Sequence, residues 1–280
     1  MEDYDIIAFI RAALEEDVRD GDHSSLSCIP ANAERQARLI VKDDGVLAGV
    51  AIAELVFREV DASLTMETFI QDGEYVKFGD IAFHVKGSAR SILTAERLVL
   101  NLMQRMSGIA TRTRSVVDLI DGTGAKVLDT RKTTPLLRYF EKLAVKIGGG
   151  ENHRFGLYDM IMLKDNHVDY AGGIEAAVRR TMDYLKEKGL SIPVEVETRN
   201  TNEVREALNA PGVDRIMLDN FTPDQVREAV KFINGRVETE ASGGITLDTI
   251  RRYAETGVDY ISMGALTHSV KSLDMSLKAF

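Results

Sequence analysis

From Val127 to His167 the chain reads VLDTRKTTPLLRYFEKLAVKIGGGENHRFGLYDMIMLKDNH. Between Arg131 and Lys164 this stretch holds seven lysines and arginines against three acidic residues, a local net charge of +4, in a protein whose formal net charge is -9. Short apolar runs precede Arg131 and Lys164, and a charge at the carboxyl end of a buried parallel strand lies where α/β-barrel enzymes place their chemistry. The stretch therefore predicts a pocket for a strongly anionic small ligand on an α/β scaffold.

The basic residues of this stretch fall into two groups. Exposed helices carry charge pairs at i,i+4 spacing, so a solvated helix face explains the middle group as well as a pocket does. This group is Arg138, Lys142 and Lys146, together with Glu141. For the outer group, positions at or near strand ends are a better explanation than a helix face. This group is Arg131, Lys132, Arg154 and Lys164.

Three short motifs follow one another here: Thr130-Arg131-Lys132-Thr133, Gly148-Gly149-Gly150 with His153-Arg154, and Leu163 to His167. Together they resemble the signature of the quinolinate phosphoribosyltransferases, also called nicotinate-nucleotide pyrophosphorylases (carboxylating). The resemblance covers nearly the whole chain and is strongest from Arg97 to His167; the first hundred residues match only loosely apart from the helix that carries Arg97. It departs at Leu136, where the family commonly has glycine, so the conformation of that loop is left open.

The resemblance implies an activity and an architecture. The activity converts quinolinate and phosphoribosyl pyrophosphate to nicotinate mononucleotide, pyrophosphate and CO₂, with Mg²⁺ required, in de novo NAD biosynthesis. The architecture is α/β, an incomplete seven-stranded α/β-barrel with an N-terminal open-faced α/β sandwich domain. We expect the sandwich over residues 1–107, joined by the segment 269–280, and the barrel over residues 108–268.

Composition excludes several other classes of protein. The chain has 280 residues and 44% hydrophobic composition, enough for one large domain or two smaller ones. Its one cysteine, Cys28, excludes an intrachain disulfide and favours a reduced, cytoplasmic setting. The acidic N-terminus does not fit a secretory or transit peptide, and no apolar run is long enough to span a membrane. Negative charge without a basic tail argues against nucleic-acid partners.

The first hundred residues predict an α+β arrangement. Apolar residues at helical spacing predict helices over 6–17, 51–60 and 91–106. Alternation between turn signals predicts strands over 37–42, 46–50, 65–70 and 81–86, with a turn over 20–25.

After Gly122-Thr123-Gly124, short apolar strands are separated by segments of helix length, which predicts a parallel sheet. No open-sheet nucleotide fingerprint is present, so a barrel is favoured. The strands are expected over 126–129, 144–147, 160–163, 194–197, 215–218, 237–240 and 260–263.

Two strand ends carry carboxylates. Glu195 and Glu197 alternate with valines and share one face, and buried carboxylates are costly unless they are paired or bound to a metal. Glu197, at the carboxyl end, is the better candidate for the site. Asp219 ends the strand of the next strand–helix repeat. The alternative explanation for Asp219 is a helix cap ahead of Thr222. The resemblance implies that Glu197 and Asp219 hold the ribose hydroxyls and Mg²⁺ of phosphoribosyl pyrophosphate.

Small residues follow the last two strands, where backbone N–H groups at helix N-termini can approach a phosphate. Tight βα turns use glycine in any case, so the glycines alone are weak evidence. The resemblance implies that these loops, with a nearby histidine, bind the 5-phosphate; the residues are Ser242, Gly243, Gly244, Gly264, Ala265, Leu266 and His268.

Arg97 lies beside Glu96 in a helix, which by itself is typical of a solvated residue. The resemblance implies instead that it reaches the active site of a neighbouring subunit, so we expect a homodimer or a higher assembly. The residues expected at the pyridine dicarboxylate are Arg97, Arg131, His153, Arg154 and Lys164. Thr130 is expected in the substrate site, and Lys132 at the pyrophosphate. The expected catalytic residues are Lys132, Lys164, Glu197 and Asp219.

Other chemistries find no support in the sequence. The five histidines and Cys28 form no zinc-ligand spacing, and neither a G-x-S-x-G motif nor a Walker-type loop is present. Two alternatives remain open. One is the molybdenum-associated homologue of the same superfamily, which would share the phosphoribosyl site; the other is a non-catalytic barrel that binds a phosphometabolite.

Overall fold

The computed structural model describes residues 4–280 and divides into two compact units. The first unit comprises Met1–Arg114, Thr134–Gly149 and Leu266–Phe280, and the second comprises Ser115–Thr133 and Gly150–Ala265. The domain boundaries expected from the sequence stay a prediction. Among the described residues, no helix has both the length and the apolar character needed to cross a membrane.

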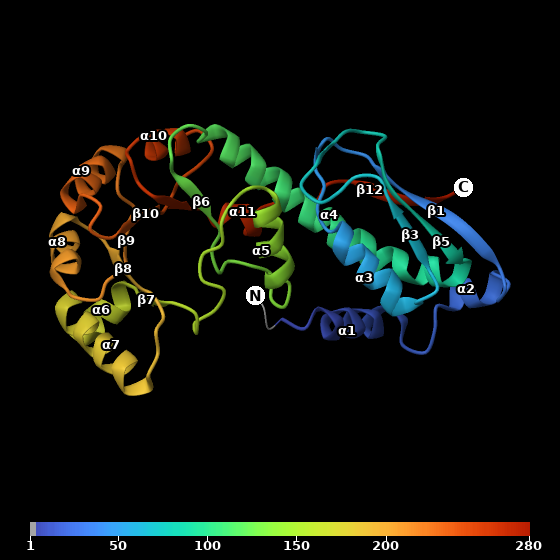
Figure 1. The fold of residues 1–280 in the computed structure, drawn as a ribbon, viewed down its shortest axis with the longest axis horizontal. Coiled ribbons are helices and arrows are strands. Elements are labelled where there is room, and N and C mark those ends of the chain that lie inside the picture. The colour runs from blue at the N-terminus through green and yellow to red at the C-terminus, as the bar shows by residue number, and fades with distance from the viewer. Residues whose placement is uncertain (1–3) are drawn as a thin grey trace. The chain divides into compact units, whose positions relative to one another are not determined.

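The first unit is built on a four-stranded antiparallel sheet in the order β12-β1-β5-β3 (Figure 1). These strands are β1 (Glu34–Val41), β3 (Thr65–Thr68), β5 (Ile81–Ser88) and β12 (Met275–Ala279). A short pair, β2 (Gly45–Val46) and β4 (Tyr75–Val76), stands apart from this sheet. The helices are α1 (Ile6–Val18), α2 (His23–Cys28), α3 (Val50–Val60), α4 (Ala89–Leu119) and α5 (Arg138–Ile147).

Apolar residues on alternate positions of β1 and β5 form the core of this unit. Leu39 and Phe83 are fully buried, and the Phe83 ring meets Phe57 of α3 edge to face, with the ring centroids 5.9 Å apart. Such a pair adds to the free energy of burial. The last strand of the chain, β12, joins the sheet through its pairing with β1.

The second unit is a six-stranded parallel sheet in the order β6-β11-β10-β9-β8-β7, with helices along its outer side (Figure 1). Its end strands, β6 and β7, do not pair with each other, so the barrel is incomplete. The strands are β6 (Lys126–Leu128), β7 (Ile161–Leu163), β8 (Val194–Thr198), β9 (Arg215–Asp219), β10 (Glu238–Ser242) and β11 (Tyr260–Ser262). The helices are α6 (Asp165–Ala171), α7 (Ile174–Lys188), α8 (Thr201–Asn209), α9 (Pro223–Ile233), α10 (Ile250–Ala254) and α11 (Ala265–His268), the last of which runs into the first unit.

The expected strand over 144–147 is wrong, because these residues end helix α5. Phe140 and Ala144 recur at helical spacing and are buried, so the helical period extends through the short apolar run that looked like a strand. The seventh strand position is reduced to a single parallel bridge between Leu128 and Glu151.

Three expectations for the first unit also need correction. The turn expected over 20–25 contains the start of α2 at His23, because Asp22 accepts the Ser25 N–H and caps a helix there. The strand expected over 46–50 is limited to Gly45–Val46, and Val50 already begins α3. The helix expected over 91–106 runs from Ala89 to Leu119.

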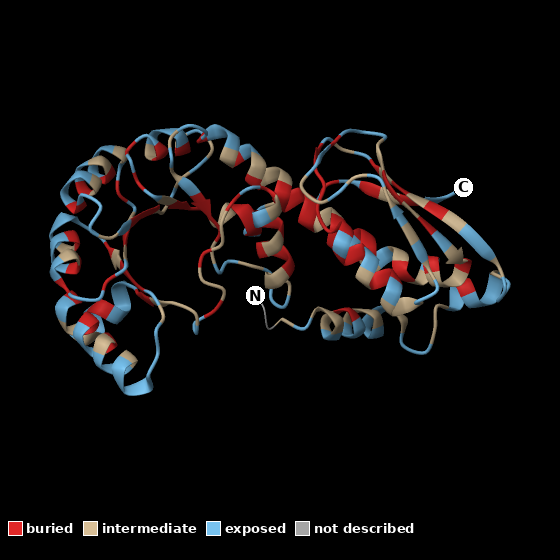
Figure 2. Ribbon diagram, in the orientation of Figure 1, coloured by how far each residue is buried: buried red, intermediate tan, exposed pale blue. Residues whose placement is uncertain are grey.

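The two faces of the parallel sheet differ in chemistry. Val196, Ile216 and Ala241 are fully buried on the face toward the helices. Because successive side chains of a strand point to opposite faces, the concave face receives charged residues instead. These are Glu195, Glu197, Arg215 and Glu240. Figure 2 shows the buried strands inside the curve of half-exposed helices.

Candidate active site

The carboxyl ends of β7, β8 and β9 bring three charged residues together. Lys164 directly follows β7, Glu197 lies near the end of β8, and Asp219 ends β9. Lys164 Nζ donates to Glu197 Oε2 at 3.2 Å. Glu197 is largely shielded from solvent, with 11% of its side chain exposed, whereas Lys164 is 49% exposed and open to a ligand.

Asp219 completes this cluster. Burial raises the pKa of its carboxyl, and the neighbouring charge of Glu197 raises it further, while Lys164 and a hydrogen bond from Asn220 act in the opposite direction. Asn220 Nδ2 donates to Asp219 Oδ2 at 2.7 Å. Because these two carboxylates repel each other, a bound cation or the hydroxyl groups of a ligand would stabilise their charged forms.

The segment after β6 and the segment before β7 supply further cations. Lys132 donates its backbone N–H to Thr130 Oγ1 at 3.1 Å, and the side chains of Arg131 and Lys132 are exposed. Arg154 Nη1 donates to Met160 O at 3.1 Å. Burial lowers the pKa of Arg154, and the nearby positive charge of Arg131 lowers it further. Two guanidinium groups held this close are suited to a ligand with more than one negative charge.

His153 lies beside these arginines but is buried, with 7% of the residue exposed. Asp129, which directly follows β6, accepts the His153 backbone N–H at 2.9 Å and the Asn152 side-chain N–H at 2.6 Å. His153 Nε2 lies 2.9 Å from Glu195 Oε2 and 3.4 Å from Glu240 Oε2. The sequence predicted His153 in the site, and the structure places its ring in the barrel interior.

Glu195, Glu240 and Arg215 were not predicted as part of the site. Burial, followed by repulsion from Glu240, raises the pKa of Glu195 to about 7. Arg215 Nη1 lies 3.2 Å from Glu240 Oε2, and its guanidinium stacks 4.1 Å above the Tyr260 ring. The sequence contains a signal for Glu195 and Arg215, because each interrupts a largely apolar strand; Glu240 lies in the polar strand Glu238–Ser242, which gives no such signal.

The loops after β10 and β9 are held against each other. The Asn220 N–H donates to Ser242 O at 2.8 Å, and Ser262 Oγ donates to Ser242 Oγ at 3.0 Å. Gly243 has φ +91°, and a Cβ built on it would lie 2.3 Å from Asn220 Oδ1. Only glycine fits there, which is a stronger reason for the residue than turn formation alone.

Several expected site residues belong to the first unit. Arg97 is exposed on α4. In α11, Leu266 is fully buried, and His268 is exposed with its Nδ1 2.6 Å from Ser269 Oγ. The remaining predicted loop residues, Gly244, Gly264 and Ala265, follow β10 and β11 in the second unit.

The middle group of charges in the opening stretch does not simply coat a surface helix. Glu141 and Lys142 of α5 are fully buried. Glu141 Oε1 accepts from Arg105 Nη2 at 2.9 Å, and Glu141 Oε2 accepts the Thr134 N–H at 3.1 Å. Glu141 therefore ties α5 to α4 and to the segment that follows Arg131 and Lys132.

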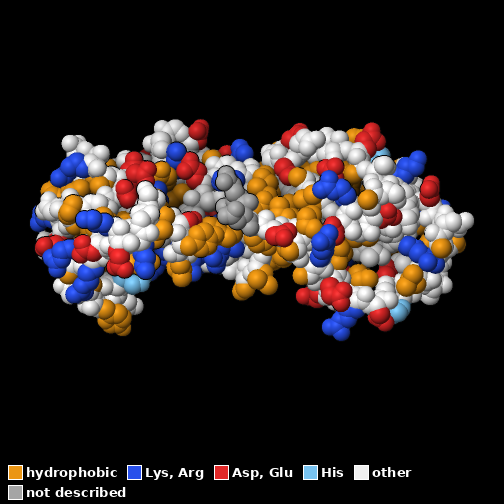
Figure 3. All heavy atoms as spheres, turned by 60° about the horizontal axis from the view of Figure 1, so that its bottom comes forward, with side chains coloured by type: hydrophobic (Ala, Val, Ile, Leu, Met, Phe, Trp, Pro, Cys, Tyr) orange, Lys and Arg blue, Asp and Glu red, His pale blue; other side chains and the backbone are white. Residues whose placement is uncertain are grey.

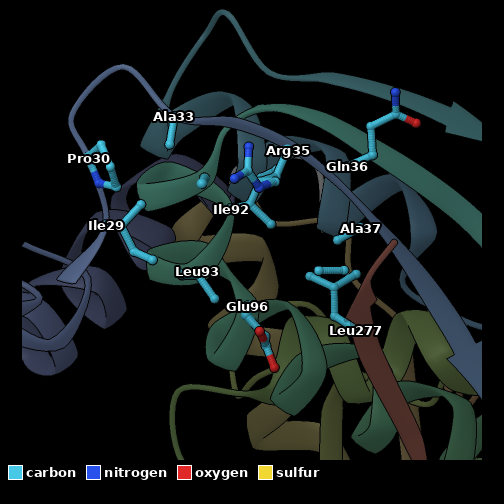
Figure 4. Close-up of a pocket in the computed structure, with 12 residues that line it drawn as sticks. Ile29, Pro30, Ala33, Arg35, Gln36, Ala37, Ile92, Leu93, Glu96 and Leu277 are labelled. Atoms are coloured by element: carbon cyan, nitrogen blue, oxygen red, sulfur yellow. The ribbon is translucent and has the colours of Figure 1, made fainter.

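An apolar pocket of about 250 Å³ lies in the first unit, between α4 and the β1–β12 side of the sheet (Figure 4). Ile92, Leu93 and Leu277 line it, with Arg35 and Glu96 as its charged residues. One cation beside one anion does not suit a ligand with several negative charges. On the face shown in Figure 3, basic and acidic side chains are interspersed. The strand ends of the second unit remain the better candidate site.

Comparison with known proteins identifies the family. The model described as quinolinate phosphoribosyl transferase, C-terminal domain, matches residues 109–278, and the model of the N-terminal domain matches residues 22–107. The chain belongs to the quinolinate phosphoribosyltransferase family. The expected α/β-barrel and N-terminal sandwich of this family are confirmed, with six parallel strands rather than seven.

Members of the quinolinate phosphoribosyltransferase family resemble the chain over almost its whole length. The chloroplastic nicotinate-nucleotide pyrophosphorylase (carboxylating) of Oryza sativa subsp. japonica is 50% identical over 290 residues, which cover 98% of this chain and 78% of that protein. The Bacillus subtilis (strain 168) protein named probable nicotinate-nucleotide pyrophosphorylase (carboxylating) is 45% identical over 262 residues, which cover 94% of this chain and 89% of that protein. The crystal structure of NadC from Streptococcus pyogenes superposes with a TM-score of 0.92 at 43% identity, covering 98% and 95% of the two chains.

Proposed function

We propose that this chain is a quinolinate phosphoribosyltransferase of NAD biosynthesis, which converts quinolinate and phosphoribosyl pyrophosphate to nicotinate mononucleotide, pyrophosphate and CO₂. The observation that carries the proposal is the group formed by Lys164, Glu197 and Asp219 at adjacent strand ends. It supplies a cation for an anionic leaving group and carboxylates for a ribose in one place. The relatives named for this reaction support the same conclusion.

The quinolinate site needs fixed cations because quinolinate carries two carboxylates. Arg131 and Arg154, close enough for their charges to interact, are the centre of this site. In the proposal, Lys164 and an Arg97 from a neighbouring subunit complete it, and His153 belongs to the same region.

The phosphoribosyl pyrophosphate site extends from Lys132 to the last two strands. Lys132, with Thr130 in the same loop, is assigned to the pyrophosphate, where Lys164 also contributes. Compact ammonium groups suit phosphate oxygens. The 5-phosphate is assigned to the loops after β10 and β11, with Gly243 allowing close approach of the backbone. Those residues are Ser242, Gly243, Gly244, Gly264, Ala265, Leu266 and His268.

The carboxylates of Glu197 and Asp219 fit a Mg²⁺ ion that is bound together with the substrate. They are hard oxygen donors, and burial together with the repulsion from Glu197 raises the pKa of Asp219, so a cation there would relieve the repulsion. When bound, Mg²⁺ would neutralise charge on the departing pyrophosphate.

The protein's own contribution to the reaction is electrostatic. As the bond from the anomeric carbon to pyrophosphate breaks, the ribose gains positive charge, which Glu197 and Asp219 stabilise in a partly shielded site. Lys164 and Lys132 stabilise the leaving group. The quinolinate ring nitrogen attacks with its own lone pair and needs no general base, so positioning by Arg131 and Arg154 supplies the remaining contribution.

Decarboxylation follows glycosyl transfer in this proposal. Once the ring nitrogen is bonded to the ribose and cationic, it stabilises the electron pair left on C2 when the 2-carboxylate leaves as CO₂, and C2 then takes a proton from water. In single turnovers the ring nucleotide should therefore form before CO₂. Release of CO₂ first would contradict this order.

A turnover assay tests the function as a whole. Purified protein is incubated with quinolinate, phosphoribosyl pyrophosphate and Mg²⁺, and nicotinate mononucleotide is measured. We expect turnover that chelation of the metal abolishes. Turnover of another aromatic substrate with phosphoribosyl pyrophosphate, but not of quinolinate, would favour the molybdenum-associated relative. Binding of phosphoribosyl pyrophosphate without any product would favour the non-catalytic barrel.

Assembly and location complete the proposal. A homodimer is proposed because an exposed Arg97 on α4 fits a residue that acts in a neighbouring subunit. A cytoplasmic location remains an expectation from the single cysteine, and the rice relative is named chloroplastic.

A further inference from the structure

The ring of His153 is held from both sides by groups of the protein. Its Nδ1 accepts the backbone N–H of Arg154 at 2.7 Å. Its Nε2 faces the two buried carboxylates, 2.9 Å from Glu195 and 3.4 Å from Glu240. With 5% of the side chain exposed, the ring offers neither nitrogen to a ligand outside the barrel.

The amide at Nδ1 determines where the ring proton lies. Burial lowers the pKa of His153, but the two carboxylates outweigh this effect and raise it to about 9, so charge alone would put a proton on both ring nitrogens. Two N–H groups cannot face each other at 2.7 Å, so Nδ1 keeps its lone pair and the ring proton lies on Nε2.

The same tautomer argues against a metal ion among these residues. His153, Glu195 and Glu240 each place one ligand atom within 4.8 Å of the others, which by itself would suit a cation. A metal bound through Nε2 needs the lone pair there and a proton on Nδ1, where the Arg154 amide leaves no room. Arg215 already supplies a positive charge 3.2 Å from Glu240 Oε2.

We propose that His153 is a positioning residue and not a substrate ligand: Glu195 and Glu240 fix its ring, and its Nδ1 fixes the backbone of Arg154, whose guanidinium binds the pyridine dicarboxylate. Arg154 is held a second time through its bond to Met160 O. Arg215 balances the charge of the carboxylates from the next strand. This inference deepens the proposed function and rests on it for the identity of the ligand.

A second histidine repeats the arrangement. His167 Nδ1 accepts the backbone N–H of Lys164 at 2.9 Å, so Arg154 and Lys164, two of the cationic residues proposed to bind quinolinate, each have their amide fixed by an imidazole. The two differ in one respect. His167 is exposed, whereas His153 is anchored by buried charges, which makes the interior cluster specific to Arg154.

Substitution of the buried carboxylates Glu195 and Glu240 tests whether they hold the His153 ring in position. Glu195→Gln keeps the shape of the side chain and removes its charge. We expect the KM for quinolinate to rise on the order of tenfold, with kcat and the KM for phosphoribosyl pyrophosphate little changed, because a small misplacement of Arg154 weakens one contact. Glu240→Gln should act in the same direction. An unchanged KM for quinolinate in folded Glu195→Gln protein would overturn the proposal.

Glu238→Gln is the matched control. Glu238 lies on the same strand as Glu240 and contacts the same arginine, with its Oε2 2.8 Å from Arg215 Nη2, but it is exposed and does not reach His153. We expect unchanged kinetics. A quinolinate defect as large as that of Glu195→Gln would mean that any charge near Arg215 has this effect, and it would overturn the role assigned to His153.

Two substitutions of His153 separate positioning from binding. His153→Ala removes the acceptor for the Arg154 amide, whereas His153→Asn keeps a side-chain oxygen at the place of Nδ1. We expect the alanine variant to lose quinolinate affinity and the asparagine variant to recover most of it. An asparagine variant as poor as the alanine variant would show that the ring itself contacts quinolinate.

Nuclear magnetic resonance of the wild-type protein gives a readout independent of activity. The ¹⁵N chemical shifts of the His153 ring should show a proton on Nε2 and none on Nδ1. The chemical shift of the Arg154 amide should differ between the Glu195→Gln variant and the wild type. If the wild-type protein does not turn over quinolinate, the proposed function is refuted. The spectrum still tests whether Nδ1 of His153 accepts the Arg154 amide, because that contact does not depend on the ligand. A proton on Nδ1, or a stoichiometric metal that Glu195→Gln loses, would overturn the inference.

Discussion

At the scale of single residues, Leu136 adopts a conformation that suits glycine. Its φ is +66°, and the residue is 82% exposed. A non-glycine residue in this region costs about 1–2 kcal/mol, while glycine adds about 0.5–1 kcal/mol of chain entropy to the unfolded state. The glycine that the resemblance leads us to expect at this position would relieve this strain.

Leu136→Gly should therefore raise the free energy of unfolding slightly, by about 0.5–1 kcal/mol. Chemical denaturation measures this. Leu157→Gly is the control, because Leu157 is also exposed but does not have a positive φ, and it should lose stability. A loss in both variants would mean that the left-handed conformation carries no strain.

Gly243 and Gly244 allow a test of the proposed phosphate loop. Both have positive φ, +91° and +63°, but an added Cβ meets Asn220 only at Gly243 and nothing within 4 Å at Gly244. Gly243→Ala should displace the neighbourhood of Asp219 and lower kcat/KM for phosphoribosyl pyrophosphate by about tenfold to a hundredfold. Gly244→Ala places alanine at an unfavourable positive φ as well, but its Cβ meets no neighbouring atom. Steady-state kinetics should therefore show a much smaller loss of kcat/KM. Equal losses would contradict the steric argument.

At the scale of elements, helix α2 begins at a charged cap. Asp22 accepts the backbone N–H of Ser25 at 3.0 Å and its hydroxyl at 2.5 Å, and these hydrogen bonds lower the pKa of Asp22. A carboxyl whose pKa is lower in the folded protein stabilises it above the unfolded value of about 4, and this stabilisation is lost as the pH falls through the folded value.

Asp22→Asn should accordingly reduce the free energy of unfolding at pH 6, and the difference from the wild type should shrink below about pH 4. Urea denaturation across this pH range measures it. Asp183→Asn, an exposed aspartate of α7, provides the comparison and should show a smaller change at pH 6. A difference for Asp22→Asn that grows on acidification would contradict the sign.

Element predictions succeeded where a period repeats and failed where a segment is short. The parallel strands were found because short strand-length runs, most of them apolar, alternate with helical segments, and their carboxyl ends then located Lys164, Glu197 and Asp219. The run over 144–147 was too short to distinguish the end of a helix from a strand. The full length of α4 was missed because its apolar pattern was followed only to Met106.

At the scale of the whole molecule, the proposed shared site makes a prediction about mixed subunits. If Arg97 of one subunit serves the site of another, Arg97→Ala and Lys164→Ala proteins should each be nearly inactive. Refolded together, they should regain about a quarter of wild-type activity per site, since some dimers then hold one intact site. No recovery, with dimers confirmed by sedimentation, would contradict a site shared between subunits.

The charged interior of the second unit could not be predicted as a cluster. Glu195 was recognised as a costly buried carboxylate, but its neighbours Arg215 and Glu240 come from other strands, and only the register of the sheet brings them to His153. Which side chains meet across a sheet depends on strand order, and the sequence alone does not contain it in readable form. The proposed contribution of Arg97 to another subunit was expected only from the resemblance, because the sequence of a helix does not show which subunit its side chains reach.

The pairing of β12 with β1 has a consequence for synthesis. Leu277 and Met275 are buried in the sheet of the first unit, yet they are made after the entire second unit. While the ribosome is still translating, β1 has one open edge, and exposed edges of this kind invite pairing with other chains. The first unit can close its sheet only when the last strand leaves the exit tunnel, so the second unit is free to fold before the first is finished.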